Sequence, residues 1–110
     1  MNQLAIDFSA ARIGRDAGMN CAIDHAERDS AGWGDRAYAY LTSYIVRHQG
    51  EFLTEDVRLY AAAEGLDPPP DNRAWGAVIV RAVKLGVMRK TGFAPAKTGH
   101  CRPMPIWSAA

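Results

Sequence analysis

Four stretches of the chain repeat apolar residues at helical spacing, and segments rich in glycine, serine or proline separate them. The first stretch covers residues 16–29, where the spacing is i, i+3, i+4, i+7, as on one face of a helix. Its apolar positions are Met19, Ala22, Ile23 and Ala26. Similar spacing predicts three further helices, over residues 35–48, 54–64 and 72–85. The sequence therefore predicts a mainly helical chain.

Capping residues and helix breakers mark the predicted ends of these helices. A side-chain oxygen at an N-cap accepts a hydrogen bond from the first turn, and glycine favours the turn that ends a helix. The predicted N-caps are Gly34 or Asp35, Thr54, and Asp71. The predicted stops are Gly50, Gly65 and Gly86. Residues 66–71 are predicted to form a stiff, non-helical connector, because they contain three consecutive prolines.

A β-hairpin is predicted after Gly86, where the apolar spacing changes. Residues 87–93 are expected to form its first strand and residues 94–99 the tip of its loop. The returning strand is expected over residues 100–108. It carries prolines at positions 103 and 105, which predict an edge strand or an irregular one, because proline cannot donate to a ladder.

Three helices followed by a two-stranded hairpin is the layout of a winged helix-turn-helix. In this interpretation hairpin 87–108 is the wing, and helix 16–29 is an addition at the N-terminal side. Residues 16–110 are expected to form one winged-helix domain. Residues 1–15 are expected to form a flexible arm. The short alternation within that arm also fits a brief edge strand, with apolar residues at Leu4, Ile6 and Phe8.

Charge is divided unevenly along the chain. The 110 residues have a net charge of +1, yet residues 1–71 hold all 12 acids and only six of the 13 basic residues. From residue 72 onward there is no acid. The seven basic residues there are Arg73, Arg81, Lys84, Arg89, Lys90, Lys97 and Arg102. This split favours a surface for a polyanion such as nucleic acid. The alternative is that the two oppositely charged halves attract each other.

The helix over residues 72–85 stands second in the helix-turn-helix and is therefore predicted to enter the major groove. Spacings of four, four and three residues predict one shared stripe on it. The stripe consists of Arg73, Ala77, Arg81 and Lys84. Asn72 and Arg73 lie at the N-terminal end, where recognition helices meet base edges, so we expect them to read adenine and guanine.

Arg81 and Lys84 are expected to contact phosphates. The small residues Gly76 and Ala77 would let the helix backbone approach a DNA groove closely. The predicted wing adds further cations at Arg89, Lys90, Lys97 and Arg102. If roughly five of these side chains met phosphates, the logarithm of affinity would fall against the logarithm of salt with a slope of about −4 to −5.

Several segments of the chain resemble small winged-helix proteins encoded by bacteriophages and prophages. The similarity covers about residues 15–108, and its segments are 23–27, 32–37, 71–76, 81–93 and 103–107. The resemblance implies a DNA-binding-like fold and identifies no catalytic residue in this chain. Phages also use small folds of this kind to inhibit host defence. The resemblance therefore also implies a protein-targeting role.

Metal and enzyme chemistry have weaker support in the sequence. Two cysteines and two histidines would make a legal tetrahedral zinc set, but their spacing matches no standard finger. They are Cys21, His25, His100 and Cys101. No nucleophile elbow, P-loop or dinucleotide fingerprint is present, so the sequence predicts neither enzyme activity nor a cofactor. The three tryptophans are expected to be core residues, at Trp33, Trp75 and Trp107. The alternative, a role in base stacking, would need their rings to be exposed.

These patterns together predict a protein that binds double-stranded DNA in transcription control or replication. The alternative is a protein-interaction module that uses the same fold to block or bridge a host protein complex. Helix 16–29 is a plausible surface for a homodimer. No apolar leader and no stretch of about 20 apolar residues is present, so the sequence predicts a cytoplasmic protein without membrane contact.

Overall fold

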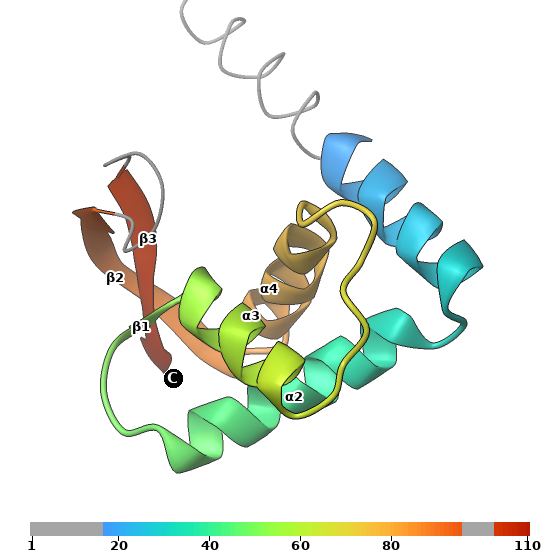
Figure 1. Ribbon diagram of the computed structural model, residues 1–110. Coiled ribbons are helices and arrows are strands. Elements are labelled where there is room, and N and C mark those ends of the chain that lie inside the picture. Colours follow the sequence, from blue (N-terminus) through green and yellow to red (C-terminus); the bar gives the residue numbers. More distant parts are fainter. Residues whose placement is uncertain (1–16, 96–102) are drawn as a thin grey trace, which may run out of the picture.

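Helices and a small antiparallel sheet meet in one hydrophobic core in the computed structural model, which describes residues 17–95 and 103–110 (Figure 1). A first helix covers residues 17–29. The other helices are α2 (Trp33–Arg47), α3 (Thr54–Ala63) and α4 (Ala74–Lys84). The strands are β1 (Phe52–Leu53), β2 (Met88–Pro95) and β3 (Pro103–Ala109). The predicted fold class, mainly helical with a C-terminal β-hairpin, is confirmed at this level.

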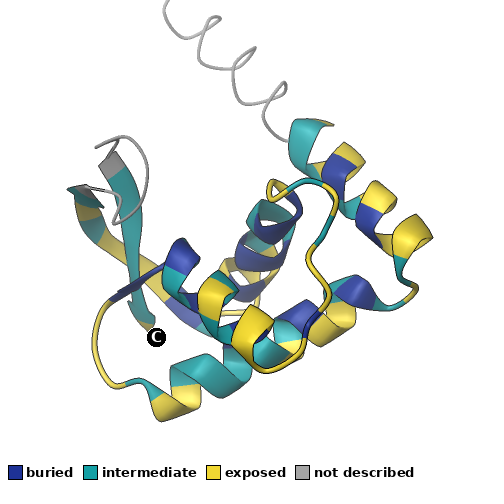
Figure 2. Cartoon of the chain, viewed as in Figure 1, coloured by how far each residue is buried: buried dark blue, intermediate teal, exposed yellow. Residues whose placement is uncertain are grey.

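The central helix of the core is α4, which carries an unbroken stripe of buried residues (Figure 2). The stripe consists of Ala74, Trp75, Val78, Ile79 and Ala82. Trp75 meets Trp33 of α2 edge to face, with ring centroids 5.5 Å apart. The Trp33 indole also donates a 2.8 Å hydrogen bond to the Asp67 carbonyl of the proline-rich connector. Both tryptophans are therefore core residues, as expected, and Trp107 is half-buried against the same core.

The start of α2 differs from the prediction. Neither Gly34 nor Asp35 is its N-cap; that position belongs to Gly32, whose φ of 78° is left-handed and suits glycine. The first N–H groups of a helix have no intrahelical acceptor. Here the carboxylate of Glu27, at the end of the preceding helix, accepts from the N–H groups of Gly32 and Gly34 at 2.8 Å each. A residue outside the helix therefore supplies the cap.

The other two helix starts also shift by one or two residues. Thr54 is the first residue of α3 rather than its N-cap, and the Asp56 carboxylate accepts the N–H of Leu53 at 2.9 Å. Asp71 does stabilise the approach to α4, because its carboxylate accepts the N–H of Arg73 at 2.9 Å. The helix itself begins at Ala74, two residues later than predicted.

The sheet has the order β1-β3-β2, and the sequence did not predict β1. Phe52 and Leu53 pair antiparallel with Trp107 and Ile106 of β3. The expectation of an edge strand for β3 is therefore wrong at this end, where β3 lies between two strands. It holds at the proline-bearing end, which pairs with β2 alone, and the irregularity lies in β2 as a register shift between Lys90 and Gly92.

A tight turn at Gly86 joins α4 to β2. Gly86 has a φ of 74°, and its N–H bonds the Val83 carbonyl at 3.1 Å. The next N–H, of Val87, reaches back to the Ala82 carbonyl at 3.0 Å. Met88, the first residue of β2, is 1% exposed and belongs to the core. The hairpin is therefore fixed against the end of α4.

Two sequence predictions fall outside the part of the chain that the structure describes. The first is the arm over residues 1–15. The second is most of the hairpin tip and the start of the returning strand, residues 96–102, which include Lys97 and Arg102. Among the described residues, no helix is long and apolar enough to cross a membrane.

Candidate nucleic-acid interface

The face of α4 that points away from the core carries the predicted recognition stripe. The buried positions of α4 fix its orientation, so the opposite face follows from the helical period. That face presents Arg73, Gly76, Ala77, Val80 and Lys84, with Arg81 at its side. The three cationic side chains among these residues are exposed. The structure therefore brings the predicted stripe to the surface, but its two ends have different neighbours.

Helix 17–29 lies over the N-terminal half of this face. A Cβ atom built on Gly76 would be 2.5 Å from the sulfur of Met19, so the absence of a side chain at Gly76 makes room for Met19. A Cβ on Gly18 would be 3.1 Å from a guanidinium nitrogen of Arg73. Gly76 was expected to let DNA approach the helix backbone. In this structure it accommodates a side chain of the first helix instead.

Arg73 forms an ion pair with Asp71 rather than standing free. The shortest distance between their charged atoms is 2.7 Å, and a second guanidinium nitrogen donates to the same carboxylate oxygen at 2.9 Å. These side-chain hydrogen bonds hold the pKa of Asp71 below its ordinary value and raise the pKa of Arg73. The Arg73 side chain is still 68% exposed. Asn72, the other expected base-reading residue, is also exposed and lies beside the connector and Trp75.

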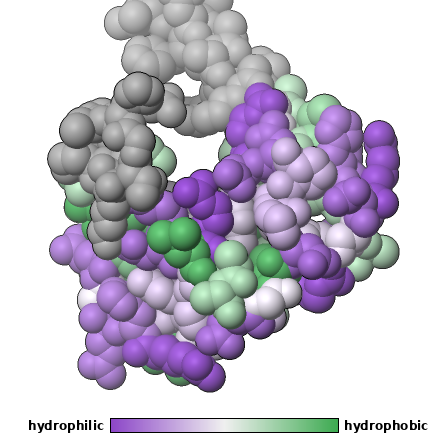
Figure 3. Space-filling view, in the orientation of Figure 1, coloured by the Kyte–Doolittle hydropathy of each residue, from purple (hydrophilic) through white to green (hydrophobic). Residues whose placement is uncertain are grey.

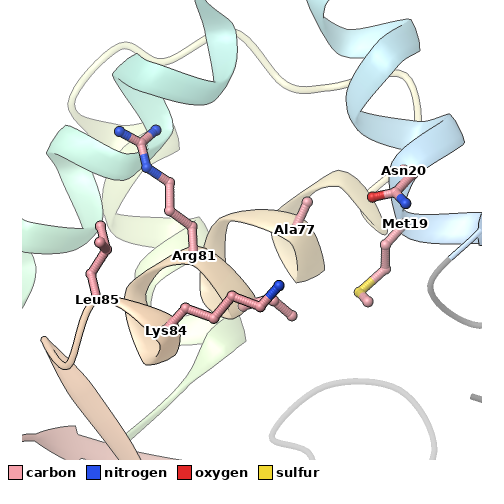
Figure 4. A pocket seen from close by; sticks show the side chains of 7 residues that line it. Met19, Asn20, Ala77, Arg81, Lys84 and Leu85 are labelled. Atoms are coloured by element: carbon pink, nitrogen blue, oxygen red, sulfur yellow. The ribbon is translucent and has the colours of Figure 1, made fainter.

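The Arg81 side chain points away from the stripe and contacts α2. Its guanidinium bonds the Asp35 carboxylate at 2.9 Å and lies 4.1 Å from the centre of the Tyr38 ring. Figure 4 shows this side chain directed toward α2. Both ion pairs among the described residues therefore join a base of the acid-free segment to an acid of the first 71 residues. The Arg81–Asp35 pair joins distant parts of the two halves, whereas Arg73 and Asp71 are local neighbours two positions apart.

Lys84 lies in a groove of about 710 Å³ between helix 17–29 and α4 (Figure 4). Met19 and Asn20 form one wall, and the rest of the lining comes from α4 and the residue after it, namely Ala77, Val80, Arg81, Lys84 and Leu85. Lys84 has no ion-pair partner within the described part of the chain. The C-terminal half of the α4 face is therefore open and positively charged.

The predicted wing adds exposed cations on β2. Arg89 and Lys90 are both exposed, and because side chains alternate along a strand they point to opposite faces of the sheet. The Lys90 ammonium lies 4.8 Å from the centre of the Phe93 ring, which is itself 61% exposed. Thr91, which follows Lys90, donates to the Glu51 carboxylate at 2.5 Å. This contact brings an acid close to the hairpin. Arg89 and Lys90 therefore do not lie on one face of the hairpin, and the described cations of α4 and β2 do not form a single row.

Only part of the cysteine and histidine set weighed as a zinc site lies within the described residues. No group of three or more histidine, cysteine or acidic side chains that could hold a metal ion occurs there. Cys21 lies exposed on helix 17–29, as does His25. The other two members, His100 and Cys101, lie outside the described residues. The described residues therefore hold only two of the four side chains that were weighed as a zinc set.

Two residues important for this surface were missed in the sequence. Met19 was assigned only to the apolar face of its helix, and Glu27 was given no role of its own. A glycine inside a helical pattern is an available signal of close approach, and Gly76 carries that signal. No local pattern in residues 17–29 shows that this helix is the one that packs against Gly76.

No protein-family model, no curated protein and no solved structure matches the chain.

Proposed function

We propose that the chain is a winged-helix protein that binds double-stranded DNA through α4 and the hairpin β2–β3. The observation that carries the proposal is the acid-free segment from Asn72 onward, which supplies both α4 and the hairpin. Its described cations are all exposed, at Arg73, Arg81, Lys84, Arg89 and Lys90. In the phage-type proteins that the sequence resembles, such a domain fits transcription control or replication.

The order of the elements supports the winged-helix assignment. A helix, a short strand, two helices and a hairpin follow one another, and the short strand β1 pairs with the second strand of the hairpin. In a winged helix this arrangement places the hairpin beside the recognition helix. The turn at Gly86 does the same here, because Val87 bonds back to Ala82 in the last turn of α4.

The two ion pairs do not prevent phosphate binding. The Arg81 and Asp35 side chains are 47% and 82% exposed, and exposed pairs of this kind contribute only about 0–1 kcal/mol to stability. A phosphate can therefore replace Asp35 at little cost. Lys84 and Arg89 have no ion pair to break within the described residues.

A salt titration of fluorescence anisotropy with a labelled duplex of about 20 base pairs tests the proposal. With five phosphate contacts, affinity should fall about 500-fold between 50 and 200 mM salt. The double variant Lys84→Gln/Arg89→Gln should reduce the salt slope by about 2. The matched variant Arg28→Gln/Arg47→Gln loses two exposed cations elsewhere and should keep the slope. Absence of binding at 50 mM, or equal losses in both variants, would exclude the proposal.

A second candidate function is a module that binds a host protein. The groove beside Lys84 favours it, because Met19, Val80 and Leu85 give the groove an apolar lining. On the face seen in Figure 3, however, hydrophobic residues form only small separate patches within a hydrophilic surface. A pull-down from host lysate that survives nuclease treatment would favour this function over DNA binding. Loss of the captured protein after nuclease treatment would favour DNA binding.

A further inference from the structure

The position of helix 17–29 conflicts with the proposed entry of α4 into the major groove. Recognition helices meet base edges with their N-terminal residues. On α4 these residues lie at the end that helix 17–29 covers, where Met19 sits against Gly76. A helix with its side chains is about 10–12 Å wide, and the major groove is about 12 Å wide. The groove therefore admits α4 alone, but not α4 and helix 17–29 side by side.

The contact between helix 17–29 and the rest of the molecule is shallow. Within this helix only Ala22 and Ala26 are buried, and alanine is the smallest apolar side chain. Met19 and Ile23 are half-buried. Among the described residues, no hydrogen bond or ion pair joins this helix to α4 itself. Ala22 and Ala26 belong to the core cluster and Ile23 packs against it, so release of the helix would expose part of that cluster but would withdraw no large, fully buried side chain.

The polar attachment of the helix lies at its C-terminal end, where a pivot would be needed. Glu27 holds the N–H groups of Gly32 and Gly34, on both sides of the first residue of α2. The chain reverses there through the left-handed Gly32. A rotation about the turn at residues 30–32 would move Met19 away from Gly76 but would displace Glu27, which is nearer the turn, much less.

We propose that helix 17–29 is a displaceable cover of α4 that competes with DNA for the same face. This inference rests on the proposed DNA-binding function. In the covered state, DNA can reach the open cations at Lys84 and Arg89, but the N-terminal end of α4 is blocked. In the released state, the α4 backbone at Gly76 and Ala77 becomes accessible to the groove, beside the already exposed Asn72 and Arg73. The observed affinity then equals the affinity of the released state multiplied by the fraction of molecules that are released.

A disulfide between positions 19 and 76 tests the proposal directly. A Cβ on Gly76 would be 3.0 Å from Cγ of Met19, so the two Cβ atoms lie at most about 4.5 Å apart, within the range of a disulfide. The variant is Met19→Cys/Gly76→Cys with Cys21 and Cys101 changed to serine. The matched control carries Met19→Cys alone on the same serine background.

The oxidised double-cysteine protein should bind the duplex at least about 10-fold more weakly than the reduced protein, because the released fraction falls toward zero. The control should bind equally in both redox states. Equal binding by the oxidised and reduced forms, while both bind as tightly as the natural chain, would overturn the cover and leave the DNA-binding function standing. Absence of DNA binding by the natural chain would exclude both the cover and the DNA-binding function.

The variant Ala26→Gln provides an independent measurement that needs no disulfide. A longer side chain at this 1% exposed position should push helix 17–29 away without adding charge. Amide exchange in residues 17–29 should become faster, and DNA affinity should rise by up to about 10-fold if roughly a tenth of the natural molecules are released. Faster exchange with unchanged or weaker DNA binding would contradict the proposal.

Discussion

α2 and helix 17–29 both lie against α4, and they do so by different means. α2 buries Trp33, Ala37 and Leu41, and its Trp33 ring meets Trp75 of α4 at 5.5 Å. Helix 17–29 buries only two alanines and places one methionine over a glycine. A contact with α4 can therefore be a permanent part of the core, as for α2, or a replaceable one, as for helix 17–29. Large interlocking side chains make the first kind of contact and small ones the second.

The largest expected effect comes from the core contact. Trp33→Ala should destabilise the protein by about 3–5 kcal/mol, because it removes the edge-to-face partner of Trp75 and leaves a cavity. Urea denaturation followed by circular dichroism measures this loss. Phe93→Ala, which removes a mainly exposed ring, should cost no more than about 0.5 kcal/mol. Similar losses in both variants would mean that α2 and α4 are not held as described.

A double-mutant cycle at Met19 and Gly76 probes the replaceable contact. In the natural chain, Gly76→Ala adds a methyl group where the Met19 sulfur lies and should be neutral or destabilising. In a Met19→Ala background the same change should stabilise the protein by about 0.5–1 kcal/mol, because alanine favours a helix interior over glycine. The free energy of unfolding of the four proteins gives the coupling. Equal effects of Gly76→Ala in both backgrounds would show that the two residues do not touch.

Asp35→Asn should have a still smaller effect on stability. It removes an exposed ion pair with Arg81, which is worth about 0–1 kcal/mol. If Arg81 binds phosphate, the same change should strengthen DNA binding, since the competing carboxylate is gone. Anisotropy titration compares it with Asp24→Asn, which removes an exposed carboxylate from helix 17–29. A gain of equal size in both variants would assign the effect to net charge alone.

The smallest effect concerns pH. Arg73 lowers the pKa of Asp71 from its ordinary value of 3.8, so this carboxylate binds protons less readily in the folded protein than in the unfolded one. The stabilising contribution is therefore present above the unfolded pKa and is lost as pH falls through the folded pKa. Melting temperatures between about pH 6 and pH 2 should fall less steeply for Asp71→Asn than for the natural chain. An identical acid slope would exclude this contribution.

The helices were predictable because their signals are local. Apolar spacing located all four, and Gly65 and Gly86 follow the ends of α3 and α4 by two residues. The N-cap of α2 was missed because its donors are satisfied by Glu27 of another helix. β1 was missed because two residues show no period, and its partner Trp107 lies more than 50 positions away.

The candidate surface also has features that follow from local sequence and features that depend on tertiary packing. Exposure of Arg73, Arg81 and Lys84 follows from the helical period, and the structure has them exposed. Their neighbours do not follow from it, because Asp35 reaches Arg81 only once α2 and α4 are packed. The cover by Met19 likewise depends on where a separate helix settles. Local chemistry identified the charges, whereas tertiary packing decided which of them have partners.

The turn at Gly86 has a consequence for association with any ligand. It ties the hairpin to α4 through Val87, and the C-terminal residue Ala110 donates in turn to the Val87 carbonyl at 3.1 Å. A ligand that touches both elements meets them already at a fixed mutual angle. The loss of conformational entropy on complex formation is correspondingly smaller, because two separately mobile elements need not be ordered.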